Sequence, residues 1–142
     1  VRYYQEFQRY IKKMGYENDL GILIAFSGTV HDGGEEYTEV SLNGIKESEL
    51  PGKFHSGEYQ VLLVAEKYQT GFDEPLLHTM FVDKKLNGVK VVQTLSRLNR
   101  TCFGKDDTFV LEILPRMYEP LLPRIMRKPA LRRQQTPTLY MN

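Results

Sequence analysis

The order of apolar and polar positions divides the first 114 residues into alternating helical and extended segments. Apolar residues recur at helical spacing from Tyr3 to Met14, which predicts an amphipathic helix. Continuous apolar runs predict buried strands at 21–26, 59–65 and 77–82, and a further strand is expected at 108–113. Helical spacing returns at 89–99, a short helix is expected at 47–54, and a loop at 27–36. Strands interleaved with helices predict a doubly wound α/β domain with a mostly parallel sheet.

The last part of the chain, residues 115–142, differs from the rest in composition. It holds five of the seven prolines and six basic residues against one acidic residue, with no hydrophobic periodicity. This composition predicts a disordered basic tail, so we divide the chain into a domain at 1–114 and a tail at 115–142. The body carries 13 basic and 17 acidic residues, which gives no broad basic surface for nucleic acid. Any contact with DNA is therefore expected to be local.

Cysteine, histidine and hydropathy exclude several classes of protein. The single cysteine, Cys102, cannot form an internal disulfide, which fits a reducing cytoplasm. No apolar run approaches the roughly 20 residues of a membrane span. His31, His55 and His78 are scattered without the spacing of metal ligands, so no metal site is expected. Val1 falls within the first expected helix, which suggests a piece of a longer protein.

Two polar segments carry the candidate chemistry. Arg97 and Arg100 are three residues apart on an expected helix and share one face, with Gln93 one turn earlier. Together they would present three donor groups to a polyphosphate, although a solvated helix face would have the same spacing. The second segment, Thr-Gly-Phe-Asp at 70–73, follows an expected parallel strand, where α/β proteins bind ligands. An ordinary turn is the alternative for this segment.

The preceding Glu66 and Lys67 are expected to form a local ion pair.

These two segments resemble a known family. The stretch from Leu62 to Leu86, which ends in TGFDEPLLHTMFVDKKL, and the stretch QTLSRLNRT at 93–101 are similar to motifs V and VI of superfamily 2 helicases. The similarity is specifically to the motor (R) subunit of type I restriction endonucleases, and it extends from about Leu20 to about Leu111. It implies the second RecA-like lobe of the motor, a doubly wound fold incomplete at both ends. The intact enzyme of this family couples ATP hydrolysis to translocation on duplex DNA and cuts it at a distance.

The resemblance implies roles on the nucleotide side of the site. Arg97 and Arg100 would face the γ-phosphate, one of them as an arginine finger for a composite ATPase site. Gln93 would bond to a phosphate or to the attacking water. Gly71 and Asp73 would lie on the nucleotide side, with Asp73 reaching the ribose or linking the two sites.

The resemblance also implies contacts with DNA. Thr70 would contact a DNA phosphate together with neighbouring backbone N–H groups. Ser27 and Gly28 follow the first strand, where motif IV lies, and would bind a phosphate of one strand. Lys84 and Lys85 end the third strand and would contact the DNA backbone.

The implied cofactor is ATP with Mg²⁺, shared with a first RecA-like lobe that this chain lacks. The chain has no phosphate-binding loop and no acidic box for Mg²⁺, so the Mg²⁺ ligands are expected elsewhere. The implied partners are duplex DNA, the first lobe and nuclease domain of the same parent chain, and the methylase and specificity subunits. The isolated chain is expected to be inactive. Two alternatives remain: a non-catalytic α/β interaction module, or the second lobe of another superfamily 2 helicase.

The tail also suggests a hypothesis about its origin. With free choice of synonymous codons, residues 113–142 permit a second reading frame that contains EATDPN. This acidic, helix-prone product resembles the sequence that follows motif VI in these motor subunits. We therefore expect that the tail is a frameshift product, which the nucleotide sequence of the gene would test.

Overall fold

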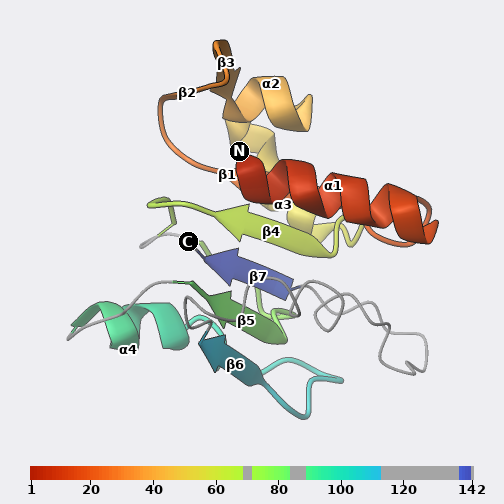
Figure 1. Cartoon of the computed structure of the whole chain (residues 1–142). Coiled ribbons are helices and arrows are strands. Elements are labelled where there is room, and N and C mark those ends of the chain that lie inside the picture. The colour runs from red at the N-terminus through yellow and green to blue at the C-terminus, as the bar shows by residue number, and fades with distance from the viewer. Residues whose placement is uncertain (69–71, 84–88, 113–137, 142) are drawn as a thin grey trace.

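A five-stranded parallel sheet forms the centre of the fold in a computed structural model that describes residues 1–68, 72–83, 89–112 and 138–141 (Figure 1). The strand order is β1-β4-β7-β5-β6, and every neighbouring pair is parallel. The strands are β1 (Ile22–Ala25), β4 (Val61–Val64), β5 (Thr79–Val82), β6 (Phe109–Glu112) and β7 (Thr138–Met141). The α/β class and the mostly parallel sheet predicted from the sequence are confirmed.

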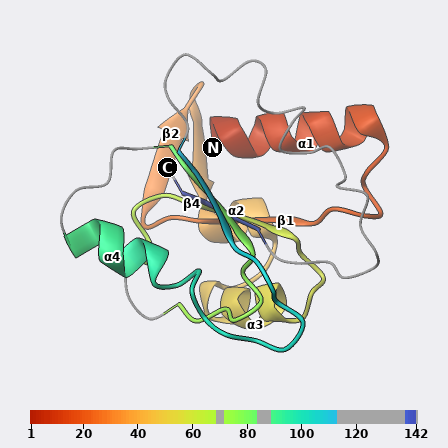
Figure 2. The same cartoon turned by 90° about the horizontal axis from the view of Figure 1, so that it is seen from below.

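Helices cover both faces of the sheet, with α1 (Arg2–Met14) on one side and α3 (Leu50–His55) and α4 (Val89–Leu95) on the other (Figure 2). Side chains of a strand point alternately to the two faces. Accordingly Leu63 packs in the cluster beneath α1, whereas Leu62 and Val64 pack in the cluster beneath α3. Burial of both faces explains why β1, β4 and β5 are continuous apolar runs.

The amphipathic helix α1 has the bounds that its periodicity predicts. It ends at Gly15, whose φ of +69° is a left-handed conformation that costs glycine little. The N–H of Gly15 donates to the Lys12 carbonyl at 3.2 Å and that of Tyr16 to the Ile11 carbonyl at 3.0 Å. Among the described residues, no helix has both the length and the apolar character that crossing a membrane requires.

The segment after β1 is not the loop expected at 27–36. It forms an antiparallel hairpin of β2 (Thr29–Asp32) and β3 (Glu35–Thr38), turned by Gly33 and Gly34 with φ values of +65° and +85°. Two glycines with positive φ suit the tight turn of a two-residue hairpin. The strands are largely exposed, so they lack the apolar run that marks a buried strand.

Three short helical elements refine the expected pattern. α2 (Glu39–Asn43) was not predicted; Thr38 caps it by accepting a hydrogen bond from the Ser41 N–H at 3.1 Å. The helix expected at 47–54 is confirmed as the 3₁₀ turn η1 (Glu47–Glu49) followed by α3. α4 ends at Leu95, earlier than the expected 99, and turns continue from it.

The tail contributes the central strand of the sheet. β7 pairs with β4 on one side and with β5 on the other, with Leu139 opposite both Leu62 and Met80. The expectation of an unstructured tail is therefore wrong for residues 138–141, while residues 113–137 lie outside the described part of the chain. The prediction from composition was wrong here because the pairing of a parallel strand depends on partners that are distant in sequence.

Deleting residues 138–142 should lower the melting temperature by more than about 10 °C, because β4 and β5 both lose their backbone partner. Thermal unfolding followed by circular dichroism measures the change. Deletion of Asn142 alone, which leaves β7 intact, is the matched control. Equal melting temperatures for the two truncated chains would show that β7 contributes nothing to the sheet.

Candidate functional site

The carboxyl ends of the parallel strands bring several of the predicted site residues to one edge of the sheet. Ala25 lies opposite Val64 at the ends of β1 and β4, so Ser27 and Gly28 leave the sheet beside the segment that begins at Ala65. Both Ser27 and Gly28 are exposed. Ligands of open α/β sheets bind at such an edge.

The predicted residues Thr70, Gly71, Lys84 and Lys85 lie outside the described residues.

Arg97 joins the two candidate segments. Its Nη1 donates a hydrogen bond to the backbone carbonyl of Phe72 at 2.6 Å. Its Nε is buried and has no acceptor among the described residues. Burial lowers the pKa of Arg97, the charge of Arg100 adds to this effect, and Asp73 opposes it. An arginine stays charged despite such a shift, so its guanidinium holds a positive charge with a donor left open.

Arg100 contacts the same loop through an ion pair. Its Nε lies 3.5 Å from Oδ1 of Asp73, and both side chains are more than half exposed. An exposed pair at this distance contributes little to stability, so its partners exchange easily with other ions. The Arg97 side chain is therefore partly buried and bonded to the backbone, whereas the Arg100 side chain is exposed and weakly paired.

The sequence predicted that Arg97 and Arg100 share one face of a continuous helix, and the structure shows that they do not. Because α4 ends at Leu95, Arg97 lies in the turns that follow, where its N–H reaches the Thr94 carbonyl at 3.4 Å, and Arg100 comes directly after those turns. Gln93 remains on the last turn of α4 and is exposed. The geometry thus joins the two arginines to Phe72 and Asp73 and leaves Gln93 on the helix.

Lys105 fixes the turns that carry the arginines, and sequence reasoning missed it. Its Nζ donates to the carbonyls of Leu98 at 2.6 Å, Arg100 at 2.9 Å and Pro75 at 3.1 Å. Burial lowers the pKa of Lys105. The lysine ties the segment after α4 to the loop before β5. No spacing in the sequence marks this role, because all three acceptors are backbone groups.

Glu74 also holds the loop before β5, through contacts with His55 and Leu76. Its side chain is 1% exposed; Oε2 lies 3.0 Å from Nδ1 of His55, and Oε1 accepts the Leu76 N–H at 3.0 Å. A polar group is unfavourable to bury unless it is hydrogen-bonded, and both carboxylate oxygens of Glu74 have partners. The loop that carries Asp73 is therefore held by His55 and Lys105 as well as by Arg97.

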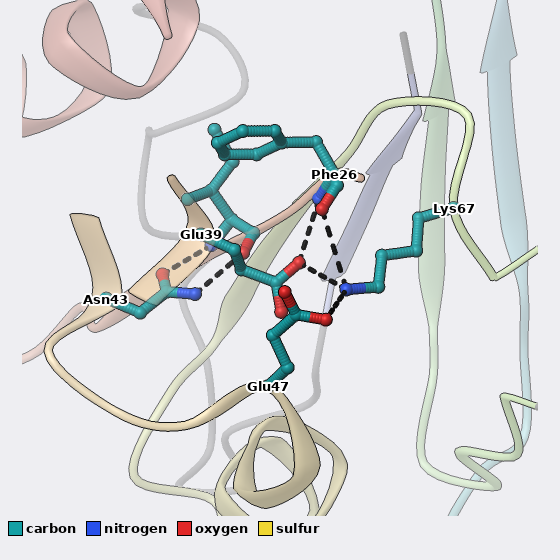
Figure 3. A network of polar contacts seen from close by, with 6 residues as sticks. Phe26, Glu39, Asn43, Glu47 and Lys67 are labelled. Atoms are coloured by element: carbon teal, nitrogen blue, oxygen red, sulfur yellow. Dashed lines mark hydrogen bonds and ion pairs between the residues drawn. The ribbon is translucent and has the colours of Figure 1, made fainter. Parts of the chain in front are cut away.

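A second polar network lies where β1 ends, and its centre is the buried Glu39 (Figure 3). Oε2 of Glu39 accepts the Phe26 N–H at 3.0 Å and the Lys67 ammonium at 2.6 Å. Lys67 also reaches Oε2 of Glu47 at 3.0 Å. The ion pair expected between Glu66 and Lys67 is wrong: the partners of Lys67 come from α2 and η1. Consecutive side chains often point apart, so proximity in sequence does not select a partner.

The helix α2 also covers the open edge of β1, the edge strand of the sheet. One turn after Glu39, Asn43 accepts the Ile24 N–H at 2.9 Å and donates to the Ile24 carbonyl at 2.7 Å (Figure 3). Together with the hydrogen bond that the Phe26 N–H donates to Glu39, these contacts satisfy backbone groups that would otherwise be free to pair with another strand. α2 thereby fixes the exit from β1 toward Ser27 and Gly28.

Burial is the largest single effect on the pKa of Lys67 and lowers it, but the hydrogen bonds to Glu39 and Glu47 and the charges of these carboxylates together raise it above the ordinary lysine value. Because the pKa in the folded state is raised, the stabilising contribution of Lys67 is complete below the ordinary lysine pKa. It is lost as the pH rises through the folded-state pKa.

Lys67→Met should lower the free energy of unfolding by about 3 kcal/mol at pH 7, because it leaves the buried Glu39 charge without its partner. The difference from the unchanged chain should shrink only above the ordinary lysine pKa. Urea unfolding across pH measures both. Lys53→Met removes the exposed pair with Glu58 and serves as the control, with no resolvable change expected. Equal effects of the two substitutions would contradict the role of burial.

Comparison with known proteins identifies the family. Residues 35–109 match the sequence family T1R_D3-like, described as type I restriction enzyme subunit R domain 3. This match covers the second strand of the hairpin, β3, together with Glu39, Lys67, Asp73 and both arginines.

Two curated relatives agree with that match. The chain is 29% identical over 89 residues to a type I restriction enzyme HindI endonuclease subunit from Haemophilus influenzae, covering 62% of this chain and 8% of that protein. It is 48% identical over 42 residues to the N-terminal part of a putative type I restriction enzyme MpnIIP endonuclease subunit from Mycoplasma pneumoniae, covering 30% of this chain and 11% of that protein. The chain thus spans about a tenth of each relative. No solved structure matches it significantly.

Proposed function

The chain belongs to the family of type I restriction enzyme R subunits, within their domain 3, and we propose that it serves as the second RecA-like lobe of such a motor. The intact subunit would use ATP hydrolysis to translocate duplex DNA, and it would contain the first lobe and the nuclease domain. Methylase and specificity subunits would complete the enzyme. The parallel sheet, with helices on both faces, is compatible with a RecA-like lobe.

One observation carries this proposal: the loop after β4 and the turns after α4 are joined by Arg97 to Phe72 and by Arg100 to Asp73. In a motor lobe, this contact would connect the nucleotide to the loop that meets DNA. Two guanidinium groups separated by two residues suit the spread charge of a triphosphate.

The two arginines would have different tasks. Arg100, exposed and weakly paired, would leave Asp73 and act as the arginine finger, meeting charge that develops on the transferred phosphoryl group. Arg97 stays tethered to Phe72 and offers its open Nε to a phosphate oxygen. Gln93 would orient a phosphate or the attacking water from the last turn of α4.

ATP would bind between this lobe and the first one, with Mg²⁺ neutralising phosphate charge. The described residues contain no group of three or more His, Cys, Asp or Glu side chains that could hold a metal ion. We propose, as the resemblance implies, that the Mg²⁺ ligands come from the first lobe. The buried, unpartnered Nε of Arg97 fits the phosphate half of the composite site.

DNA would pass over the carboxyl edge of the sheet. Ser27 and Gly28, both exposed after β1, would bind a phosphate through a hydroxyl and an open backbone. Thr70, Lys84 and Lys85 would add contacts from the segments after β4 and β5. Such contacts read no sequence, and the specificity subunit would select the recognition site.

In the full-length R subunit, Arg100→Ala should lower DNA-stimulated ATP turnover by about a thousandfold or more, because the charge it supplies is needed in the transition state. Binding of duplex DNA should remain nearly unchanged. Steady-state ATPase and DNA-binding measurements test both expectations. Arg9→Ala, which removes an exposed arginine paired with Glu6 on α1, is the matched control. Normal turnover in Arg100→Ala would refute the assignment.

The isolated 142-residue chain should bind ATP weakly or not at all, since it supplies only the arginine half of the site. Titration calorimetry with ATP and Mg²⁺ measures the affinity. Adding the chain to a separately produced first lobe should restore DNA-stimulated ATPase activity. Submicromolar binding by the chain alone, or failure of the mixture to hydrolyse ATP, would count against a divided site.

A further inference from the structure

The backbone immediately after β4 adopts an unusual conformation. Glu66 and Tyr68 have φ values of +54° and +58°, and among the described residues they are the non-glycine positions with positive φ. A side chain with a Cβ is strained in this left-handed region. Two such residues flanking one lysine persist only where surrounding contacts hold them.

Those contacts converge on Lys67, the residue between the two strained positions. Its side chain is 17% exposed, and its ammonium lies 2.6 Å from Glu39 and 3.0 Å from Glu47 (Figure 3). Oε1 of Glu39 has no partner among the described residues, so the Lys67 ammonium is the cation that compensates this buried charge. The lysine therefore cannot leave without exposing an unpaired carboxylate to a poorly solvated site.

A chain of contacts leads from this point to the candidate site. The ring of Tyr68 packs on that of Phe72, with centroids 4.9 Å apart. The carbonyl of Phe72 accepts the hydrogen bond from Arg97 at 2.6 Å, and the next residue, Asp73, pairs with Arg100. The position of Tyr68 thus bears directly on where both arginines lie.

We propose that Lys67 is a positioning residue: its ion pairs with Glu39 and Glu47 hold residues 66–68 in the strained conformation that places Phe72 and Asp73 against the arginines. The effect on catalysis rests on the proposed function; the effect on the loop does not. Glu39 and Asn43 on α2 also fix the end of β1. Lys67 consequently couples the exit of β1, which carries Ser27, to the exit of β4.

Backbone strain provides a test that separates positioning from simple stabilisation. Glycine adopts a φ near +54° without penalty, whereas alanine removes the same side chain and keeps the strain. We therefore compare Lys67→Met in a Glu66→Gly background with Lys67→Met in a Glu66→Ala background. In the 142-residue chain, NMR contacts between the Tyr68 and Phe72 rings report the position of the loop.

The ring contacts should be lost in Lys67→Met with Glu66→Ala and retained in Lys67→Met with Glu66→Gly. A role limited to pairing a buried charge would give the same result in both backgrounds, and that result overturns the proposal. If Lys67→Met prevents folding, Glu47→Gln weakens the same anchor while leaving the Glu39 pair intact. Glu47→Gln in the two backgrounds should then weaken the ring contacts more strongly with alanine, and equal weakening overturns the proposal.

The functional consequence is measured in the full-length R subunit. Glu47→Gln with Glu66→Ala should lower kcat for DNA-stimulated ATP hydrolysis by about tenfold with little change in KM, and Glu66→Gly should restore it. If Arg100→Ala is inactive and these variants have normal kcat, the positioning role is wrong. If Arg100→Ala is itself fully active while the ring contacts respond as expected, the proposed function fails and the anchoring of the loop stands.

Discussion

The buried carboxylate of Glu39 is the group on which the arrangement of the sheet edge depends. Burying a charge is unfavourable unless it is paired and hydrogen-bonded, and a single oxygen of Glu39 meets both the Phe26 N–H and the Lys67 ammonium. These groups come from α2, the end of β1 and the segment after β4. None of the three can move independently without leaving the charge uncompensated, so one carboxylate fixes their relative positions.

The parts of the fold that follow from local sequence could be predicted, and those that depend on distant partners could not. β1, β4 and β5 are apolar runs because both faces of the sheet are covered, and α1 shows its single buried face as a helical period. The β2–β3 hairpin was not predicted, because its short strands are exposed and show no apolar run. β7 was not predicted, because the surrounding sequence is rich in proline and arginine and indicates disorder. Its pairing depends instead on β4 and β5, which are distant in sequence.

The same division applies to the candidate site. Arg97, Arg100 and Asp73 were selected by their residue types and spacing together with the resemblance to the motor-subunit motifs, and the structure brings them together. Lys105 did not, because a lysine whose acceptors are all carbonyls leaves no complementary charge in the sequence. Lys67 was assigned to its neighbour Glu66, whereas its acceptors lie 28 and 20 residues away. Pairing of charges across a fold is set by the path of the backbone, which the sequence pattern describes only coarsely.

In the proposed motor, the difference between the two arginines gives a physical route between nucleotide and DNA. A phosphate that attracts Arg100 competes with Asp73 for the same guanidinium, and both side chains are exposed enough to exchange partners at little cost. Displacing Asp73 acts on the loop that Arg97 and Lys105 hold at Phe72 and Pro75. By reciprocity, a DNA contact that shifted Asp73 would change the availability of Arg100 for the phosphate. In such a motor Arg97, partly buried and bonded to Phe72, would preserve the site, while Arg100, exposed and weakly paired, would respond to the phosphate.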